Sequence, residues 1–253
     1  VLDELCFIVG PPLSVGLCVG LFPQAGPLLA MLFLALGVTA FVVQKKTEPA
    51  VSNVEVYNAS VFRLTMVKAL TLLMIFLGII VGTIDVASVA FAKAQEMPAT
   101  ASLVLSFYAV SSCAAGLIFG MMKFNASLAK RLMMASIATM ISSIPLLIVW
   151  NITSLSVTVF VAGFFFSPTM ITAMSLIEEN VPDEQLTEGL TWLLSGLGIG
   201  VALGASMAGF VIDEYSVHSG FMVALLSSVF VLLTALFVQK LQKRIEVADP
   251  CNI

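Results

Sequence analysis

One carboxylate stands inside a long apolar stretch. Residues 72–92 read LLMIFLGIIVGTIDVASVAFA, and Asp85 is their only charged residue. An ionised carboxylate without a partner is costly in apolar surroundings, so Asp85 must hold a proton or meet a polar group or water. Reversible proton binding is the chemistry open to such an acid. The alternative is that Asp85 reaches the outer interface or pairs with Lys93, two helical turns further on.

Two other acids and one tryptophan are further candidates for binding a proton or a substrate. Glu4 stands at the start of the first apolar segment, and Glu188 opens a later segment with Trp192 one turn beyond it. A solvated helix start is the simpler interpretation of Glu188. With one histidine, His218, the chain cannot build a His/Cys metal cluster and lacks the parts for Ser-His or metal-dependent catalysis. We therefore expect no enzyme activity, no metal and no cofactor.

Small residues recur at helical spacing in two stretches. They are Gly196, Gly200 and Gly204 in one, and Gly78 and Gly82 in the other. In a membrane such a stripe lets another helix backbone approach closely. Static packing and a sliding or rocking contact are both open. Because Asp85 lies on the same helical face as Gly78 and Gly82, we expect it to face a neighbouring helix or a cavity.

Prolines interrupt two apolar segments. Pro11 follows Gly10 in FIVGPPLSVG, and Pro168 stands in AGFFFSPTMITA. Proline removes a backbone donor and kinks a helix, and a membrane tolerates this only where protein or water satisfies the freed carbonyl. Kinked helices at membrane depth are typical of transporters, although receptors and channels use them too.

Composition places these residues in a bilayer. Hydrophobic residues make up 60% of the 253 and charged residues 10%, against about 45–50% and about 25% in soluble domains. The chain is therefore an integral membrane protein with the lipid bilayer as its partner. The net charge of −4 and the lack of a basic aromatic surface indicate no nucleic-acid partner.

The predicted fold is an all-α bundle of about eight transmembrane helices. A span needs about 20 apolar residues. Eight segments meet this requirement, at residues 4–22, 27–43, 65–92, 100–122, 132–150, 154–177, 187–212 and 220–238. The links are short, except for the polar residues 44–60.

Lysine and arginine predict the orientation. If the first segment starts in the cytoplasm, ten of the eleven basic residues lie on inner loops: Lys45, Lys46, Arg63, Lys68, Lys123, Lys130, Arg131, Lys240, Lys243 and Arg244. Only Lys93 lies outside. The positive-inside rule then predicts that both termini lie in the cytoplasm. We expect a multi-pass protein of the plasma membrane.

These features together resemble a major facilitator superfamily transporter, and among its members the bacterial drug and sugar efflux permeases. VLDELCFIVGPPLSVG is similar to the fifth helix of the family with its Gly-Pro antiporter motif, and PDEQLTEGLTWLLSGLGIGVALGASMAGFVID resembles the eleventh. The polar linker before RLTMVKALTLL and the GFFFSPTMITAMSLIEENVP helix also match. The resemblance spans essentially the whole chain, as helices five to twelve of the usual twelve.

The resemblance also implies departures from the family. Of the antiporter motif only Gly10-Pro11 is kept, since Cys6, Ser14 and Val15 stand where the family has glycines. About four helices are missing, so the chain reads as truncated. Residues 1–43 then form the last two helices of the N-terminal half, 44–62 a cytoplasmic linker, 63–240 the six-helix C-terminal half, and 241–253 a tail.

The function implied is proton-coupled efflux of small molecules by alternating access. The resemblance places Glu4 inside the membrane, facing the cavity. Asp85, Glu4 and Glu188 are the acids that could exchange protons, and Trp192 could line the substrate path. The substrate stays unknown. The alternative is a truncated remnant of such a permease that transports nothing.

Overall fold

The computed structural model describes residues 2–44, 60–122 and 126–248, and these residues are built from helices without strands. The α-helices are α1 (Leu2–Gly20), α2 (Ala25–Val43), α3 (Thr65–Ala94), α4 (Thr100–Met121), α5 (Leu128–Ser143), α6 (Ile152–Asn180), α7 (Leu186–Glu214) and α8 (Val217–Ala248). Short 3₁₀ helices are η2 (Val61–Arg63), η3 (Ile144–Ile148) and η4 (Asp183–Gln185). The predicted all-α fold is confirmed.

Seven helical stretches in the described residues are long and apolar enough to cross a membrane. They are α2, α3, α4, α5 with η3, α6, η4 with α7, and α8. The first helix, α1, contains a shorter apolar stretch, Ile8–Cys18. The chain is therefore a multi-pass membrane protein.

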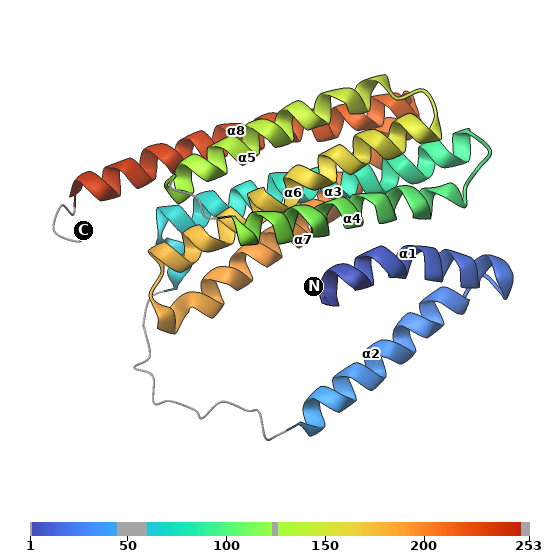
Figure 1. The fold of residues 1–253 in the computed structure, drawn as a ribbon, viewed down its shortest axis with the longest axis horizontal. Coiled ribbons are helices and arrows are strands. Elements are labelled where there is room, and N and C mark those ends of the chain that lie inside the picture. Colours follow the sequence, from blue (N-terminus) through green and yellow to red (C-terminus); the bar gives the residue numbers. More distant parts are fainter. Residues whose placement is uncertain (1, 45–59, 123–125, 249–253) are drawn as a thin grey trace.

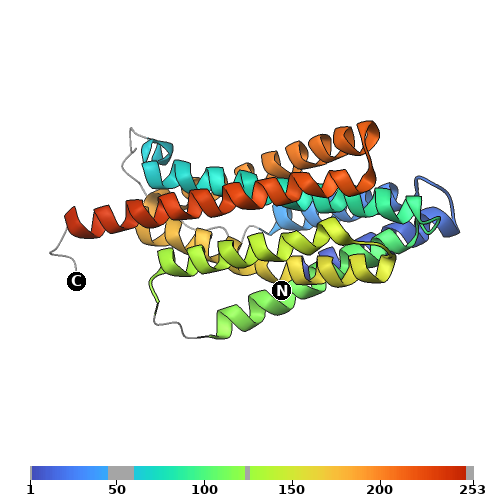
Figure 2. The ribbon, with the colours of Figure 1, turned by 90° about the horizontal axis from the view of Figure 1, so that it is seen from above.

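Helix α3 forms the centre of the bundle (Figures 1 and 2), where it packs mainly against α7 and α8. Its side chains Leu70, Leu73, Leu77 and Ile84 are at most 1% exposed. Helices α4, α5 and α6 complete the bundle, and α6 packs on both α4 and α5. A helix that is apolar over most of its surface suits this central place, because protein covers most of that surface.

Helices α1 and α2 lie to one side of the other six (Figure 1). Helix α1 packs on α4, where the Ser106 hydroxyl donates a hydrogen bond to the Ile8 carbonyl at 2.9 Å. Helix α2 packs mainly on α1, and its buried residues are Ala25 and Gly26 at its first turn. Most of the apolar surface of α2 is therefore uncovered by the described protein.

Two boundaries differ from the sequence-based expectation. The fifth predicted span ends as η3 and an extended Val149. Helix α6 begins at Ile152, after the N-cap residue Asn151, whose side chain accepts a hydrogen bond from the Ser154 amide at 2.7 Å. Helix α8 continues to Ala248, so residues 241–248 of the predicted tail are helical. The extension keeps a packed face, since Gln242 is 7% exposed.

The basic residues of the described helices gather at one end of the bundle. Because successive helices alternate in direction, the starts of α3 and α5 and the end of α8 share that end (Figure 1). Seven described basic residues lie there: Arg63, Lys68, Lys130, Arg131, Lys240, Lys243 and Arg244. Lys93 lies at the opposite end, in the last turn of α3.

Candidate functional site

Asp85 is a partly exposed carboxylate in the last third of α3. It makes no hydrogen bond or ion pair with any residue that the structure describes. Lys93 is eight residues further along α3, which is about 12 Å along the helix axis. A direct pair between Asp85 and Lys93 is absent from the described contacts.

Two hydroxyls near Asp85 in the sequence of α3 are without partners. The Oγ1 of Thr83 and the Oγ of Ser88 are fully buried, and neither has a hydrogen-bond partner among the described residues. Ser88 is one turn beyond Asp85, so the two side chains are neighbours on the helix surface. An unsatisfied buried polar group costs about 1–3 kcal/mol. This region of α3 is therefore polar at a cost in stability, which is typical of a functional position.

The glycines of α3 and α7 lie in one contact between these two helices. A Cβ added to Gly78 or Gly82 would collide with the carbonyl oxygens of Leu197 and Val201 on α7. Conversely, a Cβ on Gly200 would collide with the Ile75 carbonyl on α3. Gly196 and Gly204 make the same kind of approach, to the backbones of Thr71 and Ile79. Only glycine allows two backbones to come this close.

The glycine contact sets α3 and α7 parallel, with residue 75 of α3 level with residue 200 of α7. By the same register Glu188, at the start of α7, lies level with the start of α3. Asp85 is about 22 residues from that level, or about 33 Å along the axis. The structure therefore does not bring Asp85 and Glu188 together.

Glu188 and Trp192 instead belong to a cluster at the basic end. The Ser60 hydroxyl donates a hydrogen bond to Glu188 Oε1 at 2.5 Å, and the Trp192 indole N–H donates to the same oxygen at 3.4 Å. The Trp192 ring packs on Phe62, with 4.3 Å between centroids. Lys68 Nζ lies 5.9 Å from the Phe62 centroid. This cluster fastens the end of the polar linker to the start of α7.

The proline positions lie within continuous helices. Helix α1 runs through Gly10 and Pro11, and a Cβ on Gly10 would meet nothing within 4 Å. The side chains of Glu4 and Pro11 lie outside the described residues, so the role expected of Glu4 stays a prediction. Pro168 stands inside α6, where the Thr172 hydroxyl donates to its carbonyl at 2.7 Å.

Sequence reasoning missed a hydroxyl pair beside Pro168. Thr169 Oγ1 donates to the Phe165 carbonyl at 2.9 Å, and it lies 3.1 Å from Thr139 Oγ1 on α5. Both threonines are buried, at 0% and 3% exposed. The pair joins α5 to α6 at the turn where proline removes a backbone donor. The Ser-Pro-Thr triplet at residues 167–169 was the available signal.

The described residues hold no group of three or more His, Cys, Asp or Glu side chains that could bind a metal ion. What the region offers is one unpaired acid in a spanning helix, a close contact between two helices, and a proline-containing helix beside them.

The comparison with family models gives one match, to the Major Facilitator Superfamily, over residues 70–249. No curated protein matched the chain. The matched region runs from the first turns of α3 past the end of α8, so it contains Asp85, the glycine contact and Pro168. Because the match covers well over half of the sequence, the chain belongs to the Major Facilitator Superfamily, whose members transport solutes across membranes.

Proposed function

We propose that this chain serves proton-coupled efflux of a small molecule by alternating access, with Asp85 as the proton-binding group. The observation that carries the proposal is the setting of Asp85 within a spanning helix. The acid is partly exposed and lacks a partner among the described residues, and two buried hydroxyls without partners lie on the same helix. A carboxylate in such a place can change its protonation with its access to water.

The coupling follows from the cost of an unpaired charge in a dry site. When Asp85 faces water it can release its proton, and when the site closes it must carry one. Each protonation state therefore favours one arrangement of the helices, which is the differential interaction that a conformational change requires. Since α3 packs on α7 and α8, a movement at Asp85 is passed to both.

The other candidates take lesser parts in this proposal. The hydrogen bonds of Glu188 support a role in holding the linker, and Trp192 packs on that linker rather than on a described cavity. Glu4 is a second acid for the proton path. Gly10-Pro11 and Pro168 are the places where α1 and α6 can bend.

The test separates coupling from substrate movement. In liposomes containing the protein, a panel of fluorescent drug-like dyes and labelled sugars is followed with and without an imposed proton gradient. Asp85→Asn should abolish gradient-driven movement and keep gradient-independent exchange of substrate across the membrane. The exposed Asp213→Asn is the matched control and should behave as wild type. Gradient-driven movement at the wild-type rate in Asp85→Asn overturns the proposal.

A second candidate is that the 253-residue chain alone transports nothing. The observation favouring it is α2, whose apolar surface is mostly uncovered, so that the two helices α1 and α2 make only a small wall beside the six-helix bundle. Alternating access needs two walls around one site. Flux indistinguishable from protein-free liposomes for every compound would support this candidate, and flux above that background would exclude it.

We further propose that the basic end of the bundle faces the cytoplasm of a cell whose plasma membrane holds the protein. Single cysteines introduced into a cysteine-free background test this orientation. Ser216→Cys, between α7 and α8, should react with a membrane-impermeant thiol reagent added outside. Ser127→Cys, before α5, should react only after the membrane is opened. The reverse pattern would invert the proposed topology.

A further inference from the structure

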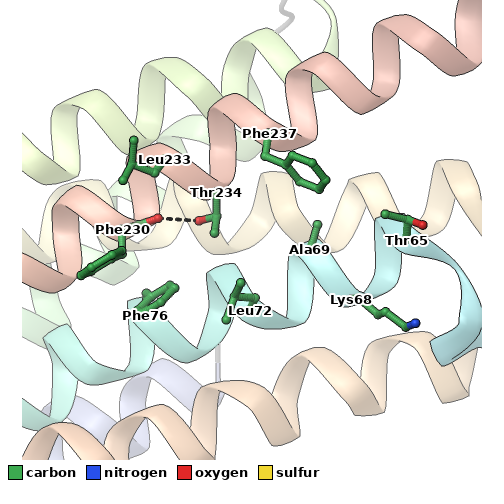
Figure 3. Close-up of a pocket in the computed structure, with 9 residues that line it drawn as sticks. All are labelled: Thr65, Lys68, Ala69, Leu72, Phe76, Phe230, Leu233, Thr234 and Phe237. Carbon is green, nitrogen blue, oxygen red and sulfur yellow. Dashed lines mark hydrogen bonds between the residues drawn. The ribbon is translucent and has the colours of Figure 1, made fainter.

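A groove of about 410 Å³ runs between α3 and α8 near the basic end of the bundle (Figure 3). Phe76 of α3 and Phe230 of α8 stack at its deeper end, with 5.0 Å between ring centroids. Leucine and phenylalanine side chains line its middle, including Leu72 and Phe237. The Thr234 hydroxyl donates a hydrogen bond to the Phe230 carbonyl at 2.7 Å (Figure 3). Its proton is therefore engaged within α8 and adds little polar character to the groove wall.

Positive charge gathers at the other end of the groove. Lys68 lines it and is exposed. On α8 the groove-lining stripe continues from Phe237 to Lys240 and Arg244, one and two turns further, and both are exposed. None of these three residues forms an ion pair with an acid among the described residues. The groove lining is therefore apolar, and exposed basic residues stand around the end of the groove where Lys68 lies.

The length of the groove and the position of the basic residues match the acyl chain and the phosphate of one phospholipid molecule. From Phe76 to Lys68 the groove covers eight residues of α3, or about 12 Å of helix axis. One leaflet of the hydrocarbon core is about 15 Å deep, half of about 30 Å. An acyl chain in the groove would thus place its phosphate among the basic side chains at the interface. Both helices are candidate spans, so the groove between them lies at membrane depth.

We propose that this groove binds an anionic phospholipid, with one acyl chain along α3 and α8 and the headgroup phosphate held by Lys68, Lys240 and Arg244. Three cations without acidic partners select a net negative headgroup over a zwitterionic one. The site is independent of the transport proposal, because neither Asp85 nor any other candidate coupling residue lines it.

The test uses native mass spectrometry of the full chain, released from detergent containing phosphatidylglycerol or phosphatidylcholine with identical acyl chains. Wild type should retain phosphatidylglycerol in preference. The double variant Lys68→Gln/Lys240→Gln should lose about 25-fold in apparent affinity, at about fivefold for each charge near the membrane surface. The matched control Lys130→Gln/Lys243→Gln removes two charges at the same end but outside the groove, and should retain the lipid.

A second pair of variants tests the apolar lining of the groove. Leu72→Trp places a larger side chain in the groove, and because Leu72 is 43% exposed the change should not disturb folding. The variant keeps every charge and should retain less phosphatidylglycerol. Leu103→Trp, on an exposed position of α4 outside the groove, should have no effect. Equal retention of the two lipids by wild type, equal loss in both charge variants, or full retention by Leu72→Trp would each overturn the proposal.

Discussion

Helices α2 and α3 are both apolar and both long enough to cross a membrane, yet they meet different surroundings. Eighteen residues of α3 are buried in the protein, against two at the first turn of α2. The helices differ in their small and polar residues. Helix α3 carries Gly78, Gly82 and Asp85, whereas a Cβ on Gly37 of α2 would meet nothing within 4 Å. Hydropathy places a helix in the membrane, and the other residues determine whether protein or lipid covers it.

The largest expected effect comes from the glycine contact. Gly200→Leu forces a side chain into the Ile75 backbone of α3, which cannot move aside as a side chain could. We expect a loss of stability of about 3 kcal/mol or more, and a low yield of folded protein. Gly37→Leu on α2 is the matched control and should be tolerated. Thermal unfolding in detergent measures both, and equal tolerance would mean that the α3–α7 contact is loose.

A comparable loss is expected from a cavity in α3. Leu77 is 0% exposed, so Leu77→Ala should cost about 2–5 kcal/mol. Leu34 of α2 is 67% exposed, and Leu34→Ala should change stability by about 0.5 kcal/mol or less. Unfolding of each variant in a series of mixed detergents would measure both changes in the free energy of unfolding. A large loss in Leu34→Ala would show that α2 is covered by another surface, such as a second copy of the chain.

A local effect is expected where the linker between α2 and α3 ends. Glu188→Gln weakens the hydrogen bond from Ser60, because a neutral amide oxygen is a weaker acceptor than a carboxylate. Amide hydrogen exchange over residues 60–63 should become faster while global unfolding is nearly unchanged. Glu184→Gln, which is exposed in η4, is the control. Unchanged exchange in Glu188→Gln would mean that packing of Phe62 on Trp192 holds the linker alone.

The smallest effect on stability is expected at Asp85. Asp85→Asn removes a carboxylate that has no described partner, so the folded state loses no contact. Thermal unfolding at neutral pH should match wild type or exceed it slightly. A clear loss of stability would reveal an ion pair between Asp85 and a residue outside the described ranges, and the role of Asp85 would then be structural.

Local sequence signals predicted the fold class and the spans, because hydropathy and small-residue spacing are read along one helix. The bounds of α2 and α4 differ from the expected ones by two residues or fewer. Contacts between distant residues were not predictable, as with Ser60 and Glu188, which are 128 residues apart. The groove between α3 and α8 was missed for the same reason. The extension of α8 was missed because charged residues such as Lys240 and Lys243 look like a solvated tail.

The pairing of α3 with α7 has a consequence for biosynthesis. Gly78 and Gly200 are separated by 122 positions, and chains grow at about 5–20 residues per second. Helix α3 must therefore wait about 6–25 seconds in the bilayer before its main partner is made. During that interval its glycine face and its lone acid are without α7. The step that completes the bundle core is thus a late one.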